Sequence, residues 1–161
     1  ITRCIDKSGK FINYKDCYFC DEWLLYETFE KWYDKNYWEC DDETMCLDKD
    51  ILIKGNRLYS PNTCVVVPTN INLLFLKSNK SRGNLPIGVR TMGKKFQARC
   101  SIDNNAKVLG IFKTINEAFD CYKTFKESYI KQVADQYASK YPNFPQKLYD
   151  AMYSYEVEIT D

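Results

Sequence analysis

The chain has 161 residues, of which 45% are hydrophobic and 16% aromatic, which is enough for one domain or two small ones and excludes a disordered chain. Its net charge of +1 conceals a basic middle: residues 77–113 hold nine Lys and Arg against one acid, whereas 1–76 hold nine against 13 and 114–161 hold five against eight. Histidine is absent, which excludes Ser-His-Asp and Cys-His nucleophiles, histidine zinc ligands and histidine acid–base catalysis.

The first half of the chain has the pattern of alternating helices and short strands. Apolar residues at helical spacing predict a helix over residues 22–34 with Asp21 as its N-cap. The buried stripe of this helix is expected to contain Leu25, Phe29, Trp32 and Tyr33. Short apolar runs and turn residues then predict a strand over 45–53, turns at 54–57 and 60–63, a strand over 64–68 and a helix over 69–76.

The second half is predicted to contain a small sheet and a long helix. Residues 77–86 are polar, basic and rich in turn formers, so we expect a linker there. Beyond it we expect three short strands and a long helix, with strands over 95–102 and 107–112, a capping box at 114–117 and amphipathic helix positions from Ala118 to Tyr137. Pro142 and Pro145 interrupt the tail, which is expected to end in a helix over 146–152 and an extended segment over 156–159.

The strand over residues 95–102 alternates between two kinds of side chain. Its apolar positions, which we expect to pack on the long helix, are Phe96, Ala98, Cys100 and Ile102. Its polar and largely basic positions are Lys95, Gln97, Arg99 and Ser101. Together with the charge of the middle block, this polar face predicts that residues 77–138 bind nucleic acid, above all double-stranded DNA. The alternative is a basic face that is only solvated.

Further residues near this face are candidates for DNA contacts. Arg90 lies on a preceding strand, and Lys94 lies at the turn beside Gly93. In the major groove, which a small sheet can enter, arginine can pair bidentately with guanine edges and glutamine with adenine edges. We expect phosphate contacts from Lys77, Lys80, Arg82 and Lys107.

Several segments of the second half together resemble the AP2 DNA-binding domain. They are residues 87–90 (IGVR), 94–99 (KKFQAR), 109–112 (LGIF), 117–118 (EA) and Tyr122. The resemblance implies a three-stranded antiparallel sheet that packs on one helix and lies in the DNA major groove. It also implies DNA-facing positions for Arg90, Lys95, Phe96 and Arg99. Phe96 stands where plant members usually have Trp, and Arg99 where they usually have Glu, so a target sequence does not carry over.

The rest of the chain resembles phage proteins described as HNH endonuclease-like with an AP2 domain behind. The matching segments are residues 20–24 (CDEWL), 47–52 (LDKDIL), 59–64 (YSPNTC), 67–68 (VP), 71–72 (IN), 147–152 (KLYDAM) and 155–159 (YEVEI). The expected α+β organisation is a degenerate HNH-like lobe with a ββα element over 1–76, a linker over 77–86, an AP2-like domain over 87–140 and a short helix and strand over 141–161. Because the chain opens on Ile1 rather than Met, we expect residues before it.

The resemblance assigns Asp48 to a metal-ligand position, Lys49 to the general-base position and Asn62 to the asparagine of an HNH nuclease. That family uses a histidine as its base, and a lysine that holds its proton at neutral pH is a poor substitute. We therefore expect no catalysis. Asp48 and Asp50 could hold Mg²⁺ through hard oxygens, and the alternative is that these acids pair with Lys49 or Lys54.

The eight cysteines raise two questions: whether the protein is in an oxidising or a reducing compartment, and whether it has a second metal site. Cys17, Cys20, Cys40 and Cys46 could form a Cys₄ zinc site, but only the first pair has knuckle spacing, so zinc is not expected. Neither a signal peptide nor a membrane span is recognisable. We therefore expect reduced cysteines in the cytoplasm, which is the host bacterial cytoplasm if a phage encodes the chain.

Three functions follow from these patterns. The first is a phage-type DNA-binding protein that reads the major groove with its sheet and carries an inactive nuclease-like lobe. The second is a metal-dependent endonuclease of the HNH or homing type. The third is a phage protein that binds and inhibits a host protein through residues 1–76, where nine cations against 13 acids give a net charge of −4.

Overall fold

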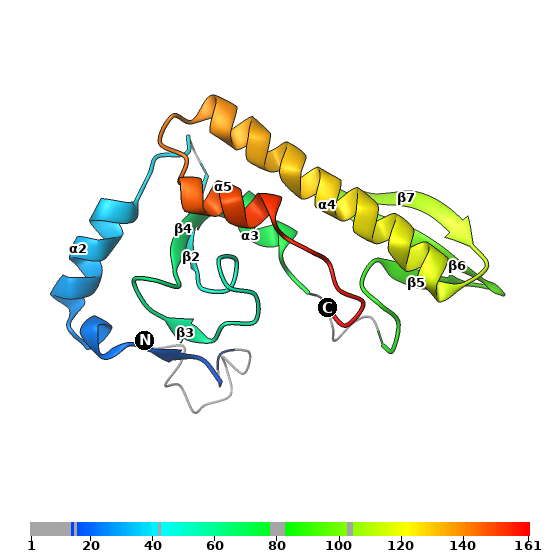
Figure 1. The fold of residues 1–161 in the computed structure, drawn as a ribbon, viewed down its shortest axis with the longest axis horizontal. Helices are drawn as coiled ribbons and strands as arrows, with labels where there is room; N and C mark the ends of the chain where they lie inside the picture. Colours follow the sequence, from blue (N-terminus) through cyan, green and yellow to red (C-terminus); the bar gives the residue numbers. More distant parts are fainter. Residues whose placement is uncertain (1–13, 15, 42, 78–82, 103–104) are drawn as a thin grey trace. The chain divides into compact units, whose positions relative to one another are not determined.

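The computed structural model describes residues 14, 16–41, 43–77, 83–102 and 105–161. The fold is mixed α+β, with mostly antiparallel strand pairs and one long helix (Figure 1), as the sequence predicts. Two compact units form: the first contains Ile1–Phe75 and Lys140–Ala151, and the second contains Leu76–Ser139 and Met152–Asp161. Within the described ranges, no helix combines the length and the apolar character that crossing a membrane requires.

The first unit is built from short elements. They are β1 (Tyr18–Phe19), the 3-10 helix η2 (Asp21–Leu24), α2 (Tyr26–Asn36), β2 (Met45–Asp48), β3 (Leu58–Tyr59), β4 (Val65–Pro68), α3 (Thr69–Leu74) and most of α5 (Gln146–Tyr153). Strand β1 pairs with β3 in parallel, and β2 pairs with β4 in antiparallel fashion. The strand expected over 64–68 and the helix expected from residue 69 are therefore present.

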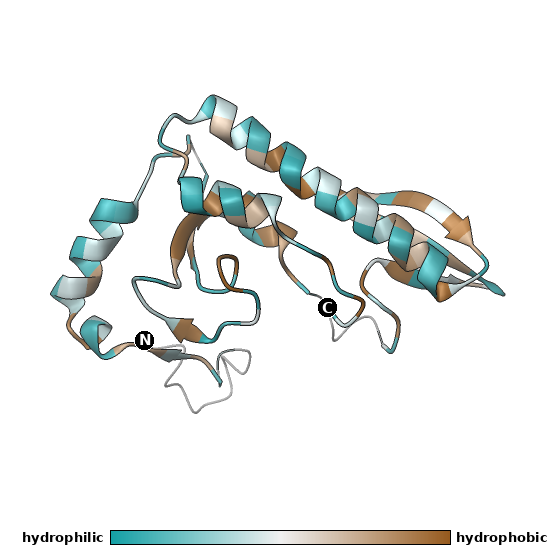
Figure 2. Ribbon diagram, in the orientation of Figure 1, coloured by the Kyte–Doolittle hydropathy of each residue, from teal (hydrophilic) through white to brown (hydrophobic). Residues whose placement is uncertain are grey.

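Strand β4 lies in the core of the first unit because its side chains are apolar and β-branched. Its three valines are at most 1% exposed, and Figure 2 shows this strand as hydrophobic. The indole nitrogen of Trp38 donates a 2.9 Å hydrogen bond to the Val66 carbonyl. The Trp38 ring also packs edge-on against Tyr141 and Phe144, so residues after α4 complete this core.

The helix predicted over residues 22–34 is broken near its start. Asp21 is not its N-cap: it begins η2, and α2 follows Leu25, which caps it without a side-chain hydrogen bond. Leu25 is 67% exposed and so does not belong to a buried stripe. Trp23 is buried instead, against the rings of Phe29 and Trp32, because burying this large ring outweighs the weak preference for an aspartate cap.

The strand predicted over residues 45–53 is also shorter than expected. Strand β2 ends at Asp48, and residues 49–53 form a series of bends. Ile51, within those bends, is 4% exposed. Ile51 is therefore apolar because a loop residue packs in the core. A sequence pattern of apolar residues does not distinguish such a loop from a strand.

The second unit contains the predicted sheet and helix. Its elements are β5 (Val89–Met92), β6 (Lys95–Ile102), β7 (Asn105–Phe112) and nearly all of α4 (Ile115–Lys140). The three strands are antiparallel in the order β5-β6-β7, and α4 lies along one face of the sheet (Figure 1). The capping box is confirmed, because Thr114 Oγ1 accepts from the Glu117 N–H at 3.2 Å and the Glu117 carboxylate accepts from the Thr114 N–H at 3.0 Å.

The core of the second unit lies between the sheet and α4. Its buried members are Val89, Ala98, Cys100, Ala118, Phe119, Tyr122 and Val157. Gly88 precedes β5 with a φ of +76°, and a Cβ at this position would lie 2.1 Å from the Tyr122 ring. Glycine is therefore required twice over, for the left-handed backbone and for the close approach of the helix.

The tail predicted to be extended over residues 156–159 contains no strand. Side chains of α4 hold it instead of a ladder: Lys123 Nζ donates to the Val157 carbonyl at 2.9 Å, and Glu127 accepts from the Val157 N–H at 2.8 Å. The Val157 side chain completes the core beneath the sheet. The helix expected over residues 146–152 is present as α5.

Candidate nucleic-acid interface

Cross-strand register decides which residues of the three-stranded sheet share a face. One face packs on α4, and the other is termed the outer face. The outer face carries Arg90, Met92, Lys95, Gln97, Arg99, Ser101, Ala106, Val108 and Ile111. All the polar positions that alternation predicts for β6 lie on it.

The outer face is positively charged. It carries Arg90, Lys95 and Arg99, while β5, β6 and β7 contain no Asp or Glu. Arg90 lies opposite Gln97, and Lys95 lies opposite Met92, so the cations surround the centre of the face. Among the described residues, no ion pair engages any of these three cations. The positive charge of the face is therefore available to a partner.

Large apolar side chains also lie on the outer face. Met92, Val108 and Ile111 are 51%, 55% and 49% exposed. The Gln97 side-chain nitrogen lies 3.7 Å from the Met92 sulfur, so side chains of β5 and β6 meet here. Sequence reasoning missed all three residues. Alternation from Arg90 could have indicated Met92, whereas the position of Val108 depends on an irregularity of β7.

That irregularity is a β-bulge. Ala98 pairs with Gly110, but the next residue of β6, Arg99, pairs with Val108. Leu109 is thus an extra residue in β7, and it packs against the core. The bulge shifts the alternation by one residue. Val108 and Lys107, which precede it, therefore face the opposite sides of the sheet from those that they would face in a regular strand.

Two predicted DNA-contacting residues lie on the other side of the sheet. Lys107 lies opposite Cys100, on the face that packs on α4, and its Nζ is 5.0 Å from the centre of the Phe125 ring. Phe96 packs against the core, as its apolar alternation indicates and contrary to its position in the AP2 pattern. We therefore remove Lys107 and Phe96 from the DNA-facing set.

The remaining cations of the basic block have different surroundings. Lys94 is exposed in the turn after Gly93, as expected. Lys77 donates a 2.7 Å hydrogen bond to the buried carboxylate of Asp161, so its charge is neutralised within the second unit. Lys80 and Arg82, like the rest of residues 78–82 in the predicted linker, lie outside the described residues.

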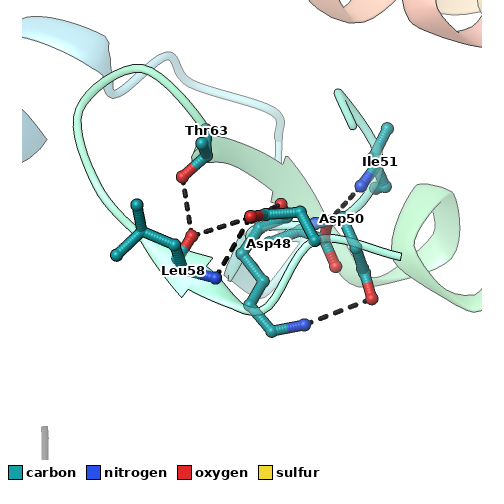
Figure 3. A network of polar contacts seen from close by, with 7 residues as sticks. Asp48, Asp50, Ile51, Leu58 and Thr63 are labelled. Atoms are coloured by element: carbon teal, nitrogen blue, oxygen red, sulfur yellow. Dashed lines mark hydrogen bonds and ion pairs between the residues drawn. The ribbon is translucent and has the colours of Figure 1, made fainter. Parts of the chain in front are cut away.

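In the first unit, Asp48 is the last residue of β2, and Lys49 follows it in the turn where β2 ends (Figure 3 shows Asp48 there). The Asp48 carboxylate accepts hydrogen bonds from the backbone N–H groups of Asp50 at 2.8 Å and Ile51 at 2.7 Å. Burial and, second, the neighbouring Asp50 carboxylate raise the pKa of Asp48 to about 6. Asp48 thus stabilises the reversal of the chain after β2.

Lys49 is engaged by an acid. Its Nζ lies 3.2 Å from the Asp50 carboxylate and 5.7 Å from the centre of the Tyr59 ring. An amine that is paired with a carboxylate is not arranged to take a proton from water. Asn62 is exposed in the following turn, and within the described chain no hydrogen bond or ion pair joins it to Asp48 or Lys49. Asp48 and Lys49 therefore share one network of polar contacts through Asp50 (Figure 3), and among the described residues Asn62 does not join it.

The same turn carries the two acids predicted from the sequence to hold Mg²⁺, Asp48 and Asp50. In the described ranges, no three His, Cys, Asp or Glu side chains come together as a metal-binding group. Asp48 is occupied by two backbone donors and Asp50 by Lys49, so Mg²⁺ at these acids stays a prediction from the sequence. Of the candidate zinc ligands, the Cys40 thiol contacts Glu43 at 3.7 Å, and the Cys46 sulfur lies 3.2 Å from the Thr69 hydroxyl.

Comparisons with protein-family models, with curated proteins and with solved structures found no match to the chain. Function must therefore be inferred from the two candidate regions themselves. The polar groups of the turn at Asp48 are paired with one another, whereas the outer face directs cations and apolar groups to solvent.

Proposed function

We propose that the second unit binds double-stranded DNA and that the outer face of its sheet enters the major groove. The observation that carries this proposal is the position of Arg90, Lys95 and Arg99 around Gln97 on a sheet without acidic residues. Such a surface attracts phosphates and gains affinity by releasing their counterions. Arginine and glutamine also supply the donors that guanine and adenine edges accept.

The absence of aromatic residues from the outer face favours a DNA duplex over other nucleic acids. Sheets that bind single strands stack the bases on exposed aromatic rings. The aromatic residues of this sheet, Phe96 and Phe112, both pack toward the core. Duplex RNA has a major groove that is too deep and narrow for side chains to read. A B-form duplex is therefore the partner that the face fits.

The resemblance of residues 87–122 to the AP2 domain supports the same proposal, because the sheet of that family lies in the major groove. With Phe96 and Lys107 removed, the proposed contacts are Arg90, Lys94, Lys95, Gln97 and Arg99. We do not extend the proposal to cleavage, because Lys49 at the general-base position is paired with an acid.

The proposal can be tested by fluorescence anisotropy of the full chain with duplexes enriched from random sequence. Affinity should fall as salt rises, with a log–log slope of about −0.9 for each phosphate contact. Arg90→Ala combined with Arg99→Ala should weaken binding by about thirtyfold or more, because a bidentate arginine–base pair contributes about 1–3 kcal/mol.

The matched control removes two cations elsewhere. Lys31→Ala combined with Lys35→Ala neutralises two exposed lysines on α2 of the first unit and leaves the sheet unchanged. Its effect on affinity should be much smaller than that of the arginine pair. Equal losses in the two double variants, or an affinity that does not respond to salt, would refute binding through the outer face.

A further inference from the structure

The outer face has two parts of different chemistry. Strands β5 and β6 contribute its polar and charged side chains, which are Arg90, Lys95, Gln97, Arg99 and Ser101. Strand β7 contributes only Ala106, Val108 and Ile111, which we term the apolar strip. Its two larger members are 55% and 49% exposed. Exposed apolar side chains along one face of an edge strand, beside a basic surface, are typical of a binding surface.

The apolar strip depends on the bulge at Leu109. Because of the bulge, Val108 lies opposite Arg99 and Ile111 lies opposite Gln97. A regular strand would turn Val108 toward α4 and Lys107 outward. The bulge thus places Leu109 against the core and at the same time leaves Val108 exposed on the outer face.

Charge decides which partner covers the strip. A second copy packed face to face would oppose Arg90, Lys95 and Arg99 of both chains, with no acid on either face. The partner must therefore be anionic and must also offer apolar groups between its charges. Duplex DNA meets both requirements, because the C5 methyl group of thymine protrudes into the major groove between the phosphate rows.

We propose that Val108 and Ile111 contact thymine methyl groups, so that the DNA target contains thymines beside the bases that Gln97 and Arg99 read. This inference rests on the proposed function, because it requires the outer face to lie in the major groove. Burial of one methyl group predicts about a fourfold gain in affinity for each contacted thymine. Uracil offers the same hydrogen-bonding groups without that methyl, so the contact can be removed from the DNA alone.

The experiment titrates the full chain with an enriched duplex and with the same duplex carrying deoxyuridine at every thymine, then at each thymine singly. Uracil is expected to weaken binding about fourfold at each contacted position and to have no effect elsewhere. In Val108→Ser/Ile111→Ser, the thymine duplex binds more weakly and the difference between thymine and uracil disappears. Leu73→Ser, at a 43% exposed apolar position of α3, retains the difference.

The outcomes separate this inference from the proposed function. If the unaltered chain binds both duplexes equally, or enriches no sequence, the methyl contact is wrong while salt-dependent DNA binding stands. If it binds no duplex at all, both proposals fail. A dimer in sedimentation that Val108→Ser/Ile111→Ser dissociates would assign the apolar strip to self-association and overturn the inference. The uracil test needs no protein variant, so a folding defect in the serine variant leaves it decisive.

Discussion

The turn at Asp48 and the outer face of the sheet were the two sites predicted from the sequence, yet they use their polar groups differently. In the turn, the Asp48 carboxylate accepts two backbone hydrogen bonds, and Lys49 pairs with Asp50. On the outer face, Arg90, Lys95 and Arg99 have no ion pair with any described residue. Polar side chains that form hydrogen bonds or ion pairs within the chain stabilise the fold. Charged side chains that are exposed to solvent are available to a partner.

Burial is the physical reason for this difference. A carboxylate that is buried away from water needs hydrogen-bond donors, and Asp48 finds them in the backbone of the turn that it stabilises. An exposed arginine keeps its hydration and pays no such cost, so it can exchange water for phosphate or a base edge.

The largest effect is expected where the sheet meets α4. Gly88→Ala should destabilise the second unit by about 2–5 kcal/mol, because the left-handed backbone and the overlap with the Tyr122 ring both oppose a Cβ. Gly93→Ala is the control: its φ is +59° but nothing lies within 4 Å, so only the backbone cost of about 1–2 kcal/mol applies. Hydrogen exchange of α4 amides in urea measures both, and equal losses would contradict the packing argument.

In the first unit, Asp48→Ala should destabilise the fold by about 1–3 kcal/mol, because two backbone donors lose their acceptor. Asp48→Asn keeps an oxygen in the same place and removes the repulsion from Asp50, so it should be at least as stable as the original chain at pH 7. Urea unfolding followed by tryptophan fluorescence distinguishes them. If Asp48→Asn instead abolished a Mg²⁺-dependent nicking of plasmid DNA, the carboxylate would belong to a catalytic site.

The raised pKa of Asp48 predicts an unusual pH dependence. The folded chain retains the Asp48 proton up to about pH 6, whereas an unfolded aspartate loses it near pH 4. The folded state therefore binds more protons in this window, and the contribution of Asp48 to stability falls by about 2–3 kcal/mol as the pH rises through it. The difference in unfolding free energy between the original chain and Asp48→Asn should change accordingly. Parallel curves for the two proteins from pH 4 to pH 7 would disprove the shift.

The smallest effect distinguishes the two faces of the sheet. Lys95→Ala should lower the log–log salt slope of DNA binding by about one, because it removes a phosphate contact from the outer face. Lys107→Ala removes the same charge from the face that packs on α4 and should leave that slope nearly unchanged. Anisotropy titrations at several salt concentrations compare the pair. A larger change for Lys107→Ala would mean that the helix side of the sheet meets DNA.

Much of the second unit could be predicted because its signals are local. The capping box from Thr114 to Glu117 is formed by neighbouring residues, and the alternation along β6 continues for the whole strand. The first unit was less predictable. Its helix was expected to start at Asp21, but the burial of Trp23 against Phe29 and Trp32 decided where α2 begins. Burial of a large aromatic ring outweighs a cap that contributes about 1 kcal/mol, and the cap pattern does not show which ring will be buried.

The sequence by itself determined the order of the strands and helices in the second unit and the concentration of cations on a sheet without acids. Only the tertiary structure decided which side each residue of that sheet faces. One extra residue, Leu109, turns Val108 outward and Lys107 toward α4, because a strand alternates with a period of two and a single insertion reverses everything on one side of it. The tertiary structure likewise decided that Asp48 and Lys49 serve a turn, since only burial and neighbours assign a carboxylate its role.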